Sequence, residues 1–188
     1  EQVCAGETVE RLPPLSCWPL DGDRLQTTPH FFAYLRVGDG CNNCCTYCAI
    51  PKIRGKFRSR PMEELVEEAK WLEKCGVKEL NIIAQDTTAY GIDLYGKYAL
   101  VDLIKALTSE TAIAKFRLLY CYPDKITDEL IEEFKENDRL INYIDLPVQH
   151  VSDGILKRMN RKGDGKIIRE TVKKLRSVPG LVIRSTAI

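Results

Sequence analysis

Three cysteines stand close together in the first third of the chain, and their spacing predicts an iron–sulfur site. Residues 40–48 contain Cys41, Cys45 and Cys48 in a C-x3-C-x2-C pattern. Cysteine thiolates hold the irons of a four-iron cubane cluster, so three thiolates leave one iron open to a ligand that is not protein. The pattern therefore indicates a 4Fe-4S cluster whose open iron can bind a small molecule and take part in chemistry.

The same residues allow other interpretations, because Cys44 lies between the three. Two adjacent C-x2-C pairs, Cys41 with Cys44 and Cys45 with Cys48, have the ligand types of a zinc site. Structural zinc sites usually separate their pairs by roughly a dozen residues or more, and neighbouring side chains in an extended loop point apart. We therefore expect Cys44 to be a bystander. Spacing alone leaves open a triad with Cys44 in place of Cys45, and a closed cluster with Cys44 as fourth ligand.

The bulk composition fits a globular enzyme. The chain has 188 residues, eight cysteines and a formal net charge of +1. A chain of this length can bury its own core without disulfides, so we interpret the clustered thiols as metal ligands. The near-neutral charge favours neither nucleic acid nor an anionic membrane. No apolar stretch approaches the ~20 residues of a membrane span, and no signal peptide is visible, so we expect a cytoplasmic protein with no membrane partner.

The strands and helices that must position this site can be predicted from the periodicity of apolar residues. Residues 1–29 contain four prolines and no sustained pattern, which predicts an irregular linker or tail. Beyond it we expect strands at 31–37, 77–84, 116–121, 143–146 and 181–187, and helices at 62–75, 100–109, 127–136, 152–159 and 166–177. This alternation predicts an α/β fold, a partial and open parallel β/α barrel. Reactive residues of such folds gather where strands end, which is where the cysteine loop, Gln85 and Gln149 fall.

Further motifs occur in order along residues 30–188 and carry a resemblance to a known family. They are Tyr47-Cys48, Ile50-Pro51-x-x-Arg54-Gly55, Ser59-Arg60-Pro61, Ala84-Gln85-Asp86-Thr87-Thr88-Ala89-Tyr90-Gly91, Asp145-Leu146-Pro147-Val148-Gln149-His150-Val151-Ser152 and Arg184-Ser185-Thr186. Together with the cysteine triad they resemble the radical S-adenosylmethionine (radical SAM) superfamily, and within it the methylthiotransferase branch. The resemblance implies that residues 30–188 form a radical SAM core that stops before its last strand.

Two groups of that branch are similar to this sequence. One modifies an adenosine of transfer RNA and typically has Gln-Asn-x-Asn-x-Tyr-Gly after the second strand, whereas residues 85–91 read Gln-Asp-Thr-Thr-Ala-Tyr-Gly. The segment favours the other group, which adds a methylthio group to the β-carbon of an aspartate in small-subunit ribosomal protein twelve. The transfer RNA activity, or a non-catalytic iron–sulfur or zinc-binding module, remains the alternative.

The resemblance also implies a mechanism and cofactor contacts. S-adenosylmethionine (SAM) would bind the open iron, and its reductive cleavage would give a 5'-deoxyadenosyl radical that takes hydrogen from the aspartate. Tyr47 would lie against the adenine, and Gln85 would hold the methionyl group. Gln149 and Arg184 would contact the ribose and the carboxylate.

Members of the branch have parts that this sequence does not contain. They carry an amino-terminal domain with a second 4Fe-4S cluster, and a small carboxyl-terminal domain that engages the substrate. The resemblance further implies an electron donor such as flavodoxin or ferredoxin. We therefore expect the methylthiotransferase activity of a longer parent enzyme, and the radical-generating core in this piece.

Overall fold

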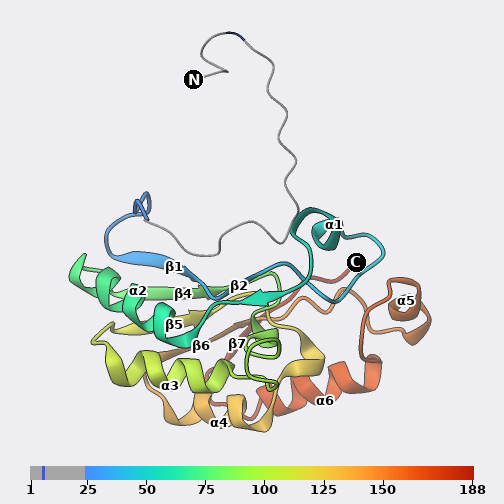
Figure 1. Ribbon diagram of the computed structural model, residues 1–188. Helices are drawn as coiled ribbons and strands as arrows, with labels where there is room; N and C mark the ends of the chain where they lie inside the picture. Colours follow the sequence, from blue (N-terminus) through green and yellow to red (C-terminus); the bar gives the residue numbers. More distant parts are fainter. Residues whose placement is uncertain (1–5, 7–23) are drawn as a thin grey trace.

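The computed structural model describes residue 6 and residues 24–188, which are built around one five-stranded sheet (Figure 1). The strands lie in the order β1-β4-β5-β6-β7, and all four pairings are parallel. They are β1 (Phe32–Arg36), β4 (Glu79–Ile83), β5 (Lys115–Leu118), β6 (Leu140–Asp145) and β7 (Val182–Arg184). In the described part of the chain β1 and β7 form the two edges, so the sheet is open. This confirms the predicted open, parallel β/α architecture.

Helices follow the strands in turn and cover one side of the sheet. Figure 1 shows α2 (Met62–Lys74), α3 (Leu100–Glu110), α4 (Asp128–Glu136) and α6 (Gly165–Leu175) along that side, whereas α5 (Asp153–Arg158) lies toward one end. Helix α2 illustrates why the sequence forms helices at these positions. Pro61 precedes α2, Glu63 and Glu64 stand in its first turn, and Leu65 and Leu72 are fully buried on one face.

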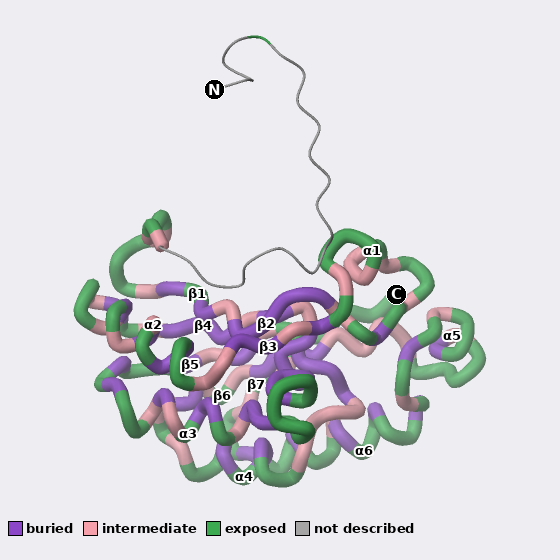
Figure 2. Tube along the Cα trace, viewed as in Figure 1, coloured by how far each residue is buried: buried purple, intermediate pink, exposed green. Residues whose placement is uncertain are grey.

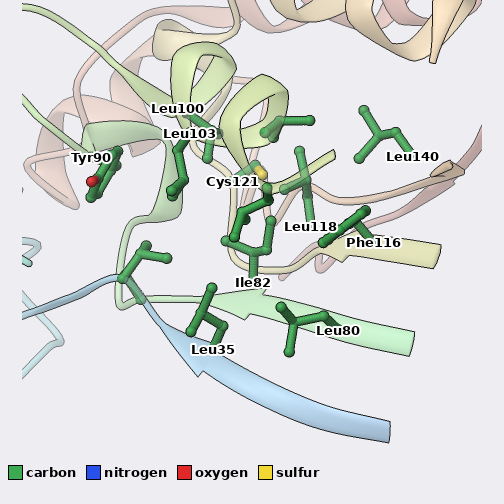
Figure 3. Close-up of a cluster of buried hydrophobic side chains, with 14 of the residues drawn as sticks. Leu35, Leu80, Ile82, Tyr90, Leu100, Leu103, Phe116, Leu118, Cys121 and Leu140 are labelled. Carbon is green, nitrogen blue, oxygen red and sulfur yellow. The ribbon is translucent and has the colours of Figure 1, made fainter. Parts of the chain in front are cut away.

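The hydrophobic core lies between the sheet and these helices. Figure 3 shows Leu35, Leu80, Ile82 and Leu118 from three neighbouring strands beside Leu103 of α3, and all five are fully buried. Figure 2 shows buried residues concentrated along the strands and exposed residues along the outer helices. With a core this continuous, the sheet is a rigid platform for the loops that leave its carboxyl edge.

The predicted strands and helices are confirmed, with ends that differ by a few residues. The largest differences are three residues: β6 begins at Leu140 rather than at residue 143, and β5 and β7 end at Leu118 and Arg184 rather than at residues 121 and 187. Several short elements were not expected, among them β2 (Gly38–Asp39), α1 (Ile50–Arg54) and β3 (Arg58–Ser59). Two-residue strands and a single helical turn have no period to recognise.

These short elements frame the cysteine loop. β2 and β3 pair antiparallel and so close the loop at its base. Gly40 follows β2 with a φ of 80°, and a Cβ there would lie 2.3 Å from the carbonyl oxygen of Lys56. The close approach of two backbone segments therefore requires glycine at this position.

The predicted linker, residues 1–29, lies mostly outside the described residues. Its described residues are residue 6 and residues 24–29, which contain neither helix nor strand, and residues 24–29 are bonded to the core. Arg24 Nη1 donates to the carbonyl of Tyr34 and to Glu68 Oε1, each at 2.6 Å. No helix of the described residues is long and apolar enough to cross a membrane.

Candidate functional site

A cavity of about 410 Å³ opens at the carboxyl edge of the sheet, where the cysteine loop meets the ends of three strands. The cysteine loop supplies one wall, and residues directly after β4 and β5 supply the floor. The cavity is lined by Arg36, Gly38, Cys41, Asn43, Cys44, Cys45, Tyr47, Cys48, Ile50, Pro51, Ile83, Ala84, Gln85, Tyr120, Cys121, Tyr122, Pro147 and Arg161. Most of the lining is apolar, which suits a site that must exclude water.

The three predicted ligands line this cavity together. Cys41, Cys45 and Cys48 are each half-buried, whereas Cys44 is exposed and has a φ of 50°. In the described part of the chain, no three His, Cys, Asp or Glu side chains converge closely enough to hold one metal ion. Each cysteine of a cubane cluster binds a different iron, so three thiolates that line one cavity fit a 4Fe-4S cluster with one open iron.

A segment far along the sequence holds the tip of the cysteine loop. The backbone N–H of Thr46 donates to the carbonyl of Met159 at 3.0 Å, and Thr46 Oγ1 donates to the carbonyl of Arg158 at 3.2 Å. Asn160 Nδ2 donates to the carbonyl of Cys44 at 2.8 Å. The loop is thereby fixed at its tip by residues 158–160, as it is fixed at its base by β2 and β3.

A buried ion pair supports the loop from below. Lys125 Nζ lies 2.5 Å from Asp86 Oδ2, and the side chains are 8% and 2% exposed. Asn43 Nδ2 donates to the same carboxylate oxygen at 2.7 Å, while Asn43 Oδ1 accepts from Lys125 at 3.1 Å. The backbone N–H and Nδ2 of Asn43 both lie 3.5 Å from the sulfur of Cys41. Asn43 therefore links the first cysteine to the buried pair.

A tyrosine lies directly against the second cysteine. Tyr122 Oη is 3.0 Å from Cys45 Sγ, and the tyrosine is buried. The guanidinium of Arg161 lies 4.3 Å from the centre of the Tyr122 ring, and Lys125 Nζ lies 4.4 Å from it. Burial and the bond to Cys45 raise the pKa of Tyr122 well above its usual range. The phenol is therefore neutral at neutral pH, and in the hydrogen bond with Cys45 either atom can be the donor.

Comparison with known proteins identifies the family. The model of the radical SAM superfamily matches residues 35–186, which is most of the chain. The chain belongs to the radical SAM superfamily. This is the superfamily that the motifs predicted, and the assignment of Cys41, Cys45 and Cys48 as cluster ligands stays a prediction.

Curated relatives refine this assignment. A protein named ribosomal protein uS12 methylthiotransferase RimO, from Caldanaerobacter subterraneus subsp. tengcongensis, is 54% identical over 163 residues, which are 87% of this chain and 37% of the relative. A Clostridium tetani protein of the same name is 52% identical over 169 residues, 89% of this chain and 38% of the relative. The chain therefore spans little more than a third of the length of these relatives. Their names agree with the ribosomal-protein group that residues 85–91 favour.

Solved structures show the same fold at low identity. The cobalamin-dependent SAM radical enzyme OxsB has a TM-score of 0.64 and 15% identity, covering 82% of this chain and 23% of its own. The radical SAM methyltransferase TsrM from Kitasatospora setae has a TM-score of 0.65 and 13% identity, covering 83% of this chain and 30% of its own. At this identity the likeness supports the radical SAM fold alone.

Two of the four predicted SAM contacts lie in the radical SAM cavity with the cysteines. Tyr47 stands at its mouth, 52% exposed, and its hydroxyl accepts a 3.1 Å hydrogen bond from Arg161. Gln85 follows β4, and among the described residues its buried Oε1 has no hydrogen-bond partner. A buried acceptor without a partner is costly, so an incoming N–H donor would stabilise it.

The other two predicted contacts lie outside the cavity lining. Gln149 has a φ of 67°, and its backbone bonds to Thr186 and Ile188. The side chain of Arg184 is 68% exposed and lies 3.8 Å from Asp145. Both residues are at the β6–β7 edge, and their contact with SAM stays a prediction.

The sequence analysis did not identify Tyr122, Lys125 or Arg161. A signal existed for Tyr122 and Lys125, because both follow a predicted strand at the reactive edge. Arg161 lies in a connection between two helices, and nothing in the local sequence distinguishes it from a solvated cation.

Proposed function

We propose that this chain is the radical-generating core of a methylthiotransferase that acts on a small-subunit ribosomal protein. The observation that carries the proposal is the 50–54% identity to relatives with that name across the residues that build the cavity. The accepting position would be the β-carbon of an aspartate, as the motif resemblance implies.

The roles of the cavity residues follow from their chemistry. Cys41, Cys45 and Cys48 would hold the 4Fe-4S cluster as thiolates. The bound cluster would supply the electron that cleaves SAM at the open iron. Gln85 would accept a hydrogen bond from the SAM ammonium group through its unpartnered Oε1. Tyr47 would pack its ring on the adenine, and its bond from Arg161 fixes the ring at the cavity mouth.

The remaining parts of the proposal concern the surroundings of this core. Gln149 and Arg184 would contact the ribose and the carboxylate from the β6–β7 edge. We include a second 4Fe-4S cluster in a further domain, an electron donor such as flavodoxin or ferredoxin, and a cytoplasmic location. The apolar walls of the cavity would keep water from the reacting atoms.

The first test measures SAM cleavage by the chain itself. After anaerobic reconstitution with iron and sulfide, the chain receives dithionite and SAM, and released 5'-deoxyadenosine is quantified by mass spectrometry. We expect release from the unaltered chain and from Cys44→Ala, and none from Cys45→Ala. Release from Cys45→Ala but not from Cys44→Ala would show that the ligand set is wrong.

The second test asks for the substrate and uses the enzyme at the full length of its relatives. Purified small-subunit protein uS12 and unmodified transfer RNA are offered in parallel with SAM, reductant and sulfide. We expect a methylthio mass increase on uS12 alone, placed on an aspartate by fragmentation. Modification of the transfer RNA alone would overturn the proposed substrate and support the alternative group.

A further inference from the structure

Tyr122 is the side chain that meets a predicted cluster ligand most directly. Its hydroxyl oxygen lies 3.0 Å from the sulfur of Cys45, which is within hydrogen-bond distance for a sulfur acceptor. The residue lies four positions after β5, and its backbone N–H donates to Thr88 Oγ1 at 3.0 Å, so its backbone is held outside the cysteine loop. The contact therefore joins the loop to the segments that follow β4 and β5.

The direction of this hydrogen bond is decided by the state of Cys45. In the free chain either atom can donate, because a thiol and a phenol both carry hydrogen. A cysteine that ligates iron is a thiolate and can only accept. The phenolic hydrogen of Tyr122 is then the donor, and the bond becomes charge-assisted.

Two cations hold the tyrosine ring in place. Arg161 and Lys125 lie 4.3 Å and 4.4 Å from the ring centre, within the range of cation–π interactions. Arg161 is itself anchored, because its Nη2 donates to the carbonyl of Pro147 at 2.6 Å. Lys125 is anchored by the buried carboxylate of Asp86. The position of the hydroxyl is thus set by groups that do not belong to the cysteine loop.

We propose that Tyr122 is a positioning residue that donates a hydrogen bond to the Cys45 thiolate and thereby raises the reduction potential of the cluster. The inference rests on the proposed function, since it requires the cluster to be bound by Cys45. Hydrogen bonds to ligand sulfurs disperse negative charge and favour the reduced cluster, whose total charge is more negative by one electron. Cys44 lines the same cavity but is exposed, and the hydrogen bond from Tyr122 goes to Cys45.

The test measures the midpoint potential of the reconstituted chain without SAM. Dithionite supplies the single electron in an anaerobic titration, and the reduced cluster is counted by electron paramagnetic resonance. We expect Tyr122→Phe to lower the ratio of reduced to oxidised cluster at a given potential by about tenfold, which is about 59 mV for a one-electron couple. Tyr120→Phe is the matched control, since Tyr120 lines the same cavity and its hydroxyl makes no hydrogen bond to a cysteine of the described residues. The potential of this variant should equal that of the unaltered chain.

The outcomes separate this inference from the proposed function. A chain that binds no cluster at all would refute the proposed function. A full cluster in Tyr122→Phe with an unchanged potential would refute the role of Tyr122 alone. If Tyr122→Phe binds less than a full cluster, 2,3-difluorotyrosine at position 122 is the second variant. Its more acidic phenol is a stronger hydrogen-bond donor, so the reduction potential of the cluster should rise. An unchanged or lower potential overturns the inference.

Discussion

The buried ion pair below the cysteine loop offers a sharp test of the structure through Lys125→Met. Methionine keeps a chain of similar length but removes the charge that lies 2.5 Å from Asp86. The carboxylate would then keep two neutral donors, Asn43 Nδ2 and Thr88 Oγ1, each at 2.7 Å. An almost fully buried carboxylate would be left without a compensating cation.

The expected magnitude follows from the burial of both partners. Removing one partner of a buried pair typically destabilises a protein by about 3–5 kcal/mol. The two neutral donors reduce this loss, while the lost contact between Lys125 and the Tyr122 ring adds up to about 1 kcal/mol. We therefore expect a decrease of about 3–4 kcal/mol in the free energy of unfolding. For a chain of this size, that is a decrease of about 6–16 °C in Tm.

The assay is urea unfolding of the metal-free chain, followed by far-ultraviolet circular dichroism. Lys174→Met is the matched control, because Lys174 lies 2.6 Å from Asp128 in a pair whose side chains are 54% and 77% exposed. An exposed pair contributes about 0–1 kcal/mol, so this control should unfold close to the unaltered chain. Equal losses in the two variants would refute the reasoning, since the difference depends on burial alone. An unchanged m value would show that the unfolded state is not altered.

Three further predictions concern backbone and protonation. Gly40→Ala places a Cβ 2.3 Å from the Lys56 carbonyl oxygen, so bound iron per chain should fall after reconstitution, whereas Gly96→Ala, with a similar φ and open space around it, should bind iron fully. Thr127→Ala removes the side chain that caps α4 and should lower the free energy of unfolding in urea by about 1 kcal/mol. Burial raises the pKa of the Asp124 carboxyl in the folded protein. The folded protein is therefore destabilised as pH rises from the unfolded-state pKa of this carboxyl through its raised folded-state pKa. Asp124→Asn should therefore unfold at a higher temperature than the unaltered chain at pH 7, and this advantage should disappear below about pH 4; an equal advantage at both pH values would contradict this reasoning.

The sequence predicted the sheet because its strands and helices carry long periodic patterns. The helix now called α2 has acidic residues in its first turn, buried leucines on one face and Gly76 after its end, so its bounds were close to correct. β6 was predicted to begin too late, because the polar Asn142 interrupts the apolar run between Ile141 and Tyr143. β2 and β3 were not predicted, since two residues on each strand contain no period and their pairing depends on the loop between them.

Only those residues of the site that a local sequence pattern marks could be predicted. The cysteine triad and Gln85 were proposed from a spacing and from a strand end, and the structure brings all four residues to one cavity. Arg161 could not, because its role depends on contacts with Tyr47 and Tyr122, which lie far away in the sequence. Such contacts are set by the packing of α5 against the cysteine loop, and no pattern in either segment encodes them.

The long-range contacts around the cysteine loop make its shape a property of the whole fold. The β2–β3 pair holds its base, residues 158–160 hold its tip, and Tyr122, four residues after β5, contacts its second cysteine. A loop held from three directions loses little conformational entropy when it binds a ligand, because most of that entropy is lost on folding. Cluster binding and folding are therefore linked: a cluster that binds only the folded chain stabilises it, and a change that loosens the sheet weakens the cluster site. The ion pair of Lys125 and Asp86 contributes both to folding and to the cluster site, because it supports the sheet edge and, through Asn43, the first cysteine.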